Sequence, residues 1–474
     1  MTQPPSPSPR SRSAAERVLA VFADVHRGEG GTALLTALAG FLLLLAYYLV
    51  KVAREPLIVG AGDDGAEWKT YAAGGQAILL VGVLALYDWI YARVSRMRLL
   101  TLSYGFFALN LLIFYALASG LGVDHAPPPG AEASVAAAVI GIGFYLWVGI
   151  FSVFVIAQFW SFANDIYTAE QGSRLFGFIA IGGTVGAATG STIAKQVIVL
   201  FGSELPVMLL GAAVLLVTLG LLAVISRREA SALARRDAAA AADSTPGAPA
   251  RPASEGGFKL VIGDRYLLYM ALLILILNLV NTTGEYILDR YLKVAAEAAF
   301  ASQGVDERTF IGAFRGDFFT IVNVVVVALQ ALVVSRFLQY RGVRVALFVL
   351  PIVALLGYVS LALIPVLLVV KVSKIAENSV DYSLQNTAQQ ALWLGTSRDQ
   401  KYKAKAVIDT FFKRGGDVLS ALLVLLGSAS LLAFDIATFI VINIAFVALW
   451  LLVTVRLTRL HRAREAALDA GGTS

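Results

Sequence analysis

The feature that most restricts the fold is a repeated run of apolar residues. A helix that crosses a membrane needs about 20 mainly apolar residues, and charge-free or nearly charge-free runs of that length recur about twelve times in this chain. Only 15% of the 474 residues are charged, whereas soluble proteins have about a quarter. The sequence therefore predicts an all-α integral membrane protein with about twelve transmembrane helices, and the lipid bilayer is its first partner.

A break in this pattern divides the chain into two halves. The residues around 240 are rich in Ala, Arg, Pro, Ser and Gly and have no apolar periodicity, which is typical of a linker. We expect five regions: a disordered cytoplasmic N-terminus at 1–29, a six-helix half at 30–226, a cytoplasmic linker at 227–259, a second six-helix half at 260–458 and a cytoplasmic tail at 459–474.

Weak internal similarity relates the two halves. Phe159-Trp160 precedes Gly182-Gly183 at the same spacing at which Leu392-Trp393 precedes Gly415-Gly416. This order favours an internal duplication, with two six-helix halves related by pseudo-two-fold symmetry about the membrane normal.

The basic residues set the orientation. Lys and Arg gather in alternate loops, for example at Arg93, Arg96 and Arg98, whereas the loop at 124–132 has neither. Cytoplasmic loops carry the excess of Lys and Arg, so both termini are predicted to be cytoplasmic in a multi-pass protein of the inner (plasma) membrane.

Composition excludes several function classes. The chain has no Cys, and its histidines, His26, His125 and His461, lie outside the apolar runs, so thiolate metal sites and an intramembrane histidine relay are excluded. There is no nucleophile elbow and no P-loop. The net charge of +6 is spread between apolar runs, which does not indicate nucleic-acid binding. We expect neither enzyme activity nor a cofactor or metal, and we expect a monomer.

Polar side chains within the spans are the candidate binding residues, because charge in a bilayer is costly unless it has a partner or faces a water-filled cavity. The first helix ends with Lys51, Arg54 and Glu55 on one face, although Arg54 and Glu55 could instead cap the helix at the interface. The seventh carries a polar stripe at steps of three and four, in which Asn278 could simply join helices. Its members are Asn278, Asn281, Thr282, Glu285 and Asp289.

The tenth and eleventh helices are also polar. The tenth carries a second stripe, whose end could instead lie in the cytoplasm, with Glu377 and Asp381 as its main candidates. The eleventh has charges at every fourth position, where opposite charges can pair. These are Lys405, Asp409, Lys413 and Asp417, with Arg414 beside them. Residues such as Lys401 and Lys403 could instead extend to the headgroups.

Six stretches occur in a characteristic order: Lys51-x-x-Arg54-Glu55-x-Leu57, Phe159-Trp160-Ser161-Phe162-Ala163-Asn164, Arg174-Leu175-Phe176, Asn278-Leu279-Val280, Tyr382-Ser383-Leu384, and Lys401 to Asp409 with Gly415-Gly416. Together they resemble the nonmitochondrial ATP/ADP translocase family of nucleotide transporters. The loop from Asp88 to Arg98 resembles the acidic–basic loop of the major facilitator superfamily. The resemblance implies a major-facilitator fold, a binding role for Asn164, and gating by Asp88, Arg93, Asp165 and Arg174.

The chain also departs from the family pattern. Asn281 stands where the family has an acid, Gln389-Gln390 replaces a Lys-Glu pair, and the acid expected within helix four is absent. The leading hypothesis is exchange of an anionic metabolite, with a nucleotide first, by alternating access. The alternatives are proton-coupled transport of another solute, with Glu285, Glu377 or Asp381 carrying the proton, and a nontransporting receptor or assembly factor.

Overall fold

The computed structural model describes residues 26, 29–91, 93–123, 134–230, 257–393, 396–397, 400–428 and 432–471. The predicted N-terminal disorder at 1–25 and most of the predicted linker, 231–256, lie outside the described residues. Every regular element in the described ranges is helical.

Where the structure describes the first half, it contains six long helices. Ser134 and Thr168 cap two of them by accepting hydrogen bonds from backbone amides of the first turn, which ends the preceding loops. The helices are α2 (Gly30–Val59), α3 (Gly65–Tyr91), α4 (Arg96–Gly120), α5 (Val135–Ile166), α6 (Ala169–Phe201) and α7 (Leu205–Arg228).

In the described residues, the second half has a short helix and six long segments, three of which contain π-helical turns. It begins with a short helix, α9 (Gly257–Gly263), and ends with α17 (Ile436–Gly471). Between them lie α10 (Arg265–Gln303), α11 (Glu307–Leu329) with η1 (Gln330–Val334), α12 (Ser335–Leu363), α13 (Leu367–Val380) with η2 (Asp381–Gln385) and α14 (Asn386–Ala391), and η3 (Gln400–Ala404) with α15 (Lys405–Val407), η4 (Ile408–Phe412) and α16 (Lys413–Ser428).

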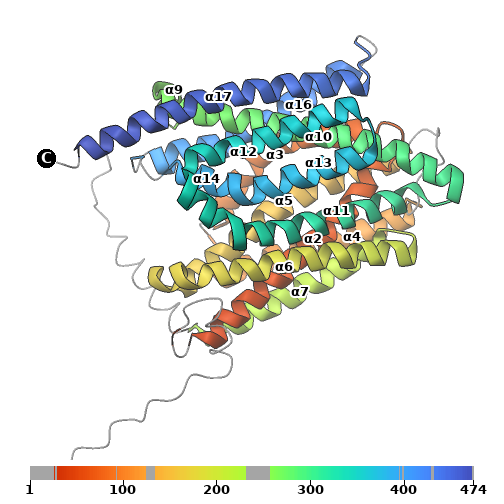
Figure 1. Ribbon diagram of the computed structural model, residues 1–474. Helices are drawn as coiled ribbons and strands as arrows, with labels where there is room; N and C mark the ends of the chain where they lie inside the picture. Colours follow the sequence, from red (N-terminus) through yellow and green to blue (C-terminus); the bar gives the residue numbers. More distant parts are fainter. Residues whose placement is uncertain are drawn as a thin grey trace, which may run out of the picture.

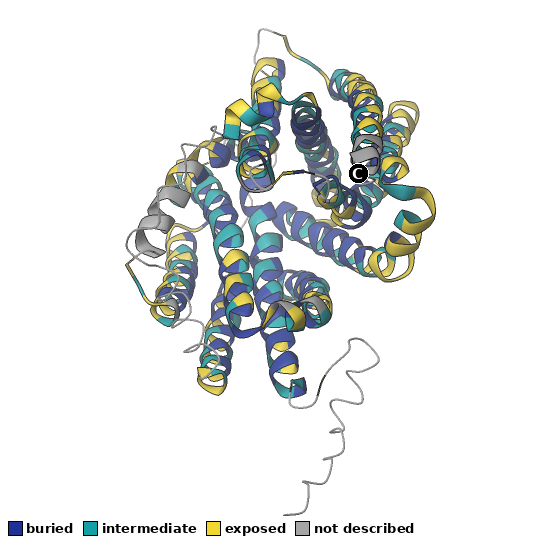
Figure 2. Ribbon diagram, turned by 90° about the vertical axis from the view of Figure 1, so that its left-hand side faces the viewer, coloured by how far each residue is buried: buried dark blue, intermediate teal, exposed yellow. Residues whose placement is uncertain are grey.

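These elements form one bundle of roughly parallel rods (Figure 1). Eight helical stretches of the described chain are long and apolar enough to cross a membrane, one of which, Glu307–Leu363, contains two consecutive segments. Large apolar side chains such as Leu200, Ile262 and Leu363 are exposed on the outside, and buried residues face the interior (Figure 2). An apolar exterior is expected where lipid surrounds the bundle.

The halves meet mainly through α6 against α11 and α3 against α16, with α2 also touching α11. We call the end where α2 finishes at Val59 and α10 at Gln303 the distal end. The opposite end, where α2 and α10 begin, is the proximal end, which the basic residues predict to be cytoplasmic.

Glycines bring α6 close to α2: Gly182, Gly186 and Gly190 recur at every fourth position, and small residues at that spacing predict close helix packing. A Cβ atom on Gly182 would lie 2.7 Å from the carbonyl oxygen of Ala37, and one on Gly190 would lie 2.5 Å from that of Leu45. Neither position has room for a side chain, so the absence of a Cβ sets the distance between these helices.

Some segments begin earlier or run further than the apolar runs. The seventh apolar run covers residues 266–284 and the eighth covers 318–335, so the sequence predicts spans with these bounds. In the structure the seventh segment continues to Gln303, and the eighth starts at Glu307. The reason is that charged residues at the distal end are helical and buried, which an apolar count cannot detect.

Candidate functional site

A polar cavity of about 360 Å³ lies between the two halves. It is bounded by α2, α3 and α5 from the first half and by α10, α11, α13, η2 and α16 from the second. Its charged lining consists of Lys51, Arg54, Glu55, Lys69, Glu285, Asp289, Lys413, Arg414 and Asp417.

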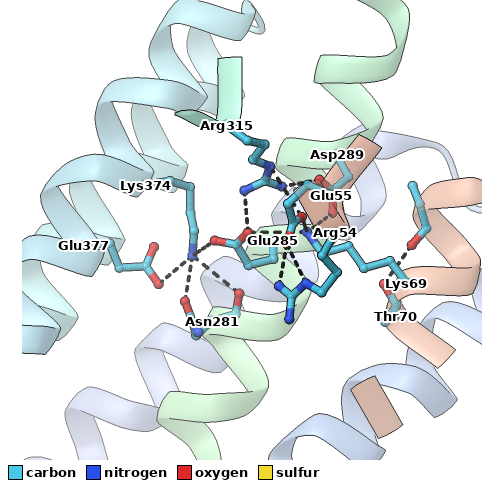
Figure 3. A network of polar contacts seen from close by, with 11 residues as sticks. Arg54, Glu55, Lys69, Thr70, Asn281, Glu285, Asp289, Arg315, Lys374 and Glu377 are labelled. Carbon is cyan, nitrogen blue, oxygen red and sulfur yellow. Dashed lines mark hydrogen bonds and ion pairs between the residues drawn. The ribbon is translucent and has the colours of Figure 1, made fainter. Parts of the chain in front are cut away.

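The distal wall of this cavity is an ion-pair network that joins the halves (Figure 3). The Nζ of Lys69, on α3, lies 2.6 Å from a carboxylate oxygen of Glu55 and 2.7 Å from one of Asp289 on α10. Arg315 of α11 pairs with Asp289 and lies 3.6 Å from Glu55. Lys69 and Arg315 thus each contact Glu55 of the first half and Asp289 of the second.

The network continues into the second half through Glu285. Its carboxylate accepts a hydrogen bond from Arg315 at 2.9 Å and lies 3.7 Å from the Nζ of Lys374. Lys374 also donates to Asn281 Oδ1 at 2.8 Å and to Glu377 at 3.1 Å. Figure 3 shows these side chains converging from the neighbouring helices.

The charges of this network cancel. The carboxylates of Glu55, Glu285, Asp289 and Glu377 face the cations of Arg54, Lys69, Arg315 and Lys374. Arg315 and Lys374 are fully buried, and a buried charge is tolerated only when it is well paired. The network can therefore hold the halves together without a ligand. Among the described residues, no group of acidic or histidine side chains is arranged to hold a metal ion.

The cations that remain for a ligand are Lys51 and Lys413. Both line the cavity, and neither forms an ion pair with any described residue. The Nζ of Lys51 lies 4.2 Å from the ring centre of Phe319 and 4.9 Å from that of Tyr48, so aromatic faces hold it. By contrast, Arg414 lies 3.3 Å from Asp417.

A second cavity, also of about 360 Å³, adjoins the first. Tyr382 and Lys413 line both. The remaining lining is mostly amide and carboxylate: Asn278, Asp381, Asn386, Gln389, Gln390 and Asp409, with Ile274 and Leu277 as an apolar wall.

The distal end is closed by further contacts between the halves. Arg308, at the start of α11, is fully buried; it donates to the carbonyl oxygens of Gly60 and Val123 and lies 3.3 Å from Glu204. Glu204 lies in the loop before α7, where burial raises its pKa to about 7 although the Arg308 guanidinium acts in the opposite direction. Lys293 also donates to the Gly62 carbonyl.

Other contacts strengthen this closure. Arg290 lies 3.1 Å from Glu67, and Lys195 of α6 lies 2.8 Å from Asp317 of α11. Every contact between halves in this set lies toward the distal end.

The structure places the predicted site residues in three groups. Lys51, Arg54, Glu55, Asn281, Glu285, Lys413 and Arg414 line the first cavity, Asn278, Asp381 and Asp409 line the second, and Glu377 lies behind the first as a partner of Lys374. Lys405 is outside both, where it donates to Gln390 at 2.6 Å. Asn164 is exposed and lines neither cavity.

The predicted gating residues lie at the proximal end, apart from both cavities. Arg174 lies 3.1 Å from Glu29 within the first half. Although burial acts in the opposite direction, hydrogen bonds from Arg174, Gln171 and the His26 backbone lower the pKa of Glu29 to about 2. The structure does not describe the side chain of Asp88. Arg93 and Asp165 both interact with other residues, and neither lines either cavity.

Three network residues were not singled out from the sequence. Lys69 and Arg315 stand just outside the apolar runs used to place helices, and Lys374 lies on the polar stripe of the tenth helix. Asp289 was recognised as a member of the stripe on the seventh helix, but it was not selected as a site residue. The spacing of Arg308 and Arg315, about two helical turns apart, was a signal that they share one face of α11.

Comparison with known proteins agrees with this architecture. The family model described as TLC ATP/ADP transporter matches residues 142–461. The chain is 24% identical to ADP,ATP carrier protein 1 of Chlamydia pneumoniae, over 93% of each chain.

Solved transporter structures share the fold. A peptide transporter POT in complex with sulfate is similar at a TM-score of 0.59 and 12% identity, covering 94% of this chain and 99% of the other. A bacterial homologue of the iron transporter ferroportin, in an inward-facing state, gives 0.58 and 14%, with 89% and 98% covered. The nucleoside transporter NupG gives 0.52 and 13%, with 91% and 98% covered.

These similarities confirm the predicted fold, an all-helical membrane protein of the major-facilitator type, and the prediction of a transporter rather than an enzyme. The family model covers more than half of the chain, including α10, the polar tenth and eleventh segments and most of α5. The chain belongs to the TLC ATP/ADP transporter family.

Proposed function

We propose that this protein exchanges nucleotides, with ATP and ADP as the leading pair, across the inner membrane by alternating access. The family and the relative named as an ADP,ATP carrier support the substrate class. The observation that carries the proposal is the pair of cavity cations: Lys51 has aromatic rings around its amine, and Lys413 lies near Asp381, Asp409 and Asp417 without forming an ion pair with any of them.

A phosphate chain would complete this charge balance. Besides the neutral network and the Arg414–Asp417 pair, the first cavity is lined by the cations Lys51 and Lys413, on α2 and α16 of opposite halves. An anion bound between them contacts both halves, which is what a substrate that drives their relative movement must do. Lys binds phosphate as a compact point charge.

The same feature supports exchange rather than net transport. When the empty carrier changes conformation, the cavity closes around cations that have no bound anion. Burying a charge without a partner is costly. The empty carrier should therefore reorient slowly, and a bound nucleotide on either side should accelerate the movement.

The conformation is assigned to the inward-facing side of the cycle. The halves are joined at the distal end, which the distribution of basic residues predicts to be extracytoplasmic. With both termini cytoplasmic, the cavity would then exchange substrate with the cytoplasm.

The test is uptake of labelled ATP into proteoliposomes with or without ADP inside. Internal ADP should accelerate uptake of ATP several-fold or more. Lys51→Met and Lys413→Met should each weaken ATP binding roughly ten- to hundred-fold, since a hydrogen bond to a charged group contributes about 1.5–3 kcal/mol. Arg341→Gln, an exposed cation at the proximal end of α12, is the control and should behave as the wild type.

Two results would contradict the proposal. Uptake that does not depend on internal nucleotide would exclude exchange. Unchanged ATP affinity in both Lys variants would show that these side chains do not hold the phosphates.

A further inference from the structure

The second cavity differs in chemistry from the first. The first is lined mainly by charged side chains, whereas the second presents, besides Lys413 and two carboxylates, neutral amides from Asn278, Asn386, Gln389 and Gln390. Amides recognise uncharged hydrogen-bonding groups, because each offers a donor and an acceptor in one plane.

Much of this hydrogen-bonding capacity is unused. Asn278 donates to the Ile274 carbonyl at 2.8 Å, which leaves its Oδ1 as an acceptor. Gln390 accepts from Lys405 at 2.6 Å, which leaves its Nε2 as a donor. Asn386 and Gln389 form no hydrogen bond with another described residue. The cavity therefore offers free donors and acceptors together.

The position of the second cavity ties it to the first. Lys413 lines both, so a ligand with phosphates near Lys51 and Lys413 would extend its other end into the amide-lined space. Two π-helical turns supply this wall: η2 carries Asp381 and Tyr382, and η4 carries Asp409. Such turns occur frequently at functional sites.

The remaining lining fits an aromatic heterocycle. Ile274 and Leu277 form an apolar surface on which a ring can lie, and the Tyr382 ring stands at the junction. The carboxylates of Asp381 and Asp409 accept hydrogen bonds, so they favour a ligand that donates, such as an amino group on a base or the hydroxyls of a ribose.

We propose that the second cavity is the subsite that binds the base of the nucleotide, and that Asn386 and Gln389 read the edge of a base carrying an amino group. This inference rests on the proposed function: it divides one substrate between a cationic cavity for phosphate and an amide cavity for base and ribose. An amide can pair with an adenine edge through two hydrogen bonds, as Asn and Gln do in nucleic-acid recognition.

The test compares ATP with UTP, which share ribose and triphosphate and differ in the base. Each competes with labelled ATP for the purified full-length protein, and the readout is the ratio of the two affinities. The wild type should prefer ATP by about tenfold, the effect of one good hydrogen-bonded contact. Asn386→Leu and Gln389→Met should each bring the ratio close to one, whereas Lys51→Met should weaken both nucleotides and leave the ratio unchanged.

The ratio does not depend on the folded fraction, so a partly unstable variant still gives an answer. An ATP-to-UTP ratio that stays at the wild-type value in both amide variants would overturn the assignment. A wild type that binds both nucleotides equally would overturn it as well. A wild type that binds neither ATP nor UTP would refute the proposed function itself. In that case the Lys51→Met variant would give the same absence of binding as the wild type.

Discussion

At the scale of single residues, the site separates cations with a structural partner from cations without one. Arg54 was predicted to contact an anion, yet its guanidinium hydrogen-bonds Glu55 and stacks on Tyr145 at 4.3 Å. Lys51, on the same helix face, has the rings of Tyr48 and Phe319 beside its amine and no ion pair with a described residue. The sequence identified the charged face, but it could not distinguish these roles, because Glu55, the partner of Arg54, also pairs with cations that come from α3 and α11.

Arg315 should be the most sensitive residue of the network. Its guanidinium contacts the carboxylates of Glu55, Glu285 and Asp289, and it is fully buried. Arg315→Met leaves those carboxylates underpaired, and breaking a buried pair typically costs about 3–5 kcal/mol. We expect a large fall in melting temperature in detergent.

A second substitution distinguishes charge from packing. Asp289→Asn removes one of the stranded charges, so the double variant Arg315→Met with Asp289→Asn should be more stable than Arg315→Met alone. Strictly additive losses in the melting temperatures would show that the pair does not interact as the structure indicates.

At the scale of elements, apolar runs predicted where most helices lie but not how far they extend. Residues 318–335 were predicted as the eighth span, whereas the helical segment begins at Glu307 and carries Arg308 and Arg315 toward the first half. An apolar count stops at a charge, and only the partner helices make that charge acceptable within the membrane. The close packing of α6, by contrast, can be predicted from its small residues, because it depends on the absence of a side chain and not on the identity of the partner residue.

Substitutions along α6 should reveal the face that packs on α2. Gly190→Leu places its Cβ 2.5 Å from the Leu45 carbonyl oxygen, whereas a Cβ on Gly177 of the same helix meets no atom within 4 Å. Overpacking costs about 1–3 kcal/mol or more when backbone must move. Gly190→Leu should lower the melting temperature and the yield of monodisperse protein, and Gly177→Leu is the matched control. Equal behaviour of the two variants would contradict the close α2–α6 contact.

At the scale of the whole molecule, contacts between the halves close the distal end of the bundle, and the two adjoining cavities lie on the proximal side of these contacts. The chain has no native cysteine, so introduced pairs report on this arrangement without further changes. The hydroxyls of Thr192 and Thr320, from opposite halves, lie 3.1 Å apart. Oxidation of Thr192→Cys with Thr320→Cys should form a disulfide that abolishes exchange, and reduction should restore it. Full exchange in the cross-linked protein would mean that the halves need not separate there.

The last prediction is that pH shifts the balance between the distal-closed state and a distal-open state. In the closed state, burial raises the pKa of Glu204 to about 7, against the ordinary value of 4.5, with Arg308 partly offsetting the effect. In an open state Glu204 meets water and regains its ordinary value. Between about pH 4.5 and 7, the closed state therefore binds a proton that the open state lacks. Linkage then favours closure at low pH, and this advantage is lost as pH rises through that window.

Spin labels at exposed sites on the two halves can measure this shift. Leu200→Cys and Ala301→Cys lie near the distal ends of α6 and α10, and their distance distribution should move toward longer separations as pH rises from 5 to 8. Glu204→Gln cannot ionise and should keep the low-pH distribution throughout, because it imitates the protonated carboxyl. A distribution in the wild type that ignores pH, or one that shifts equally in Glu204→Gln, would show that Glu204 does not control the distal closure.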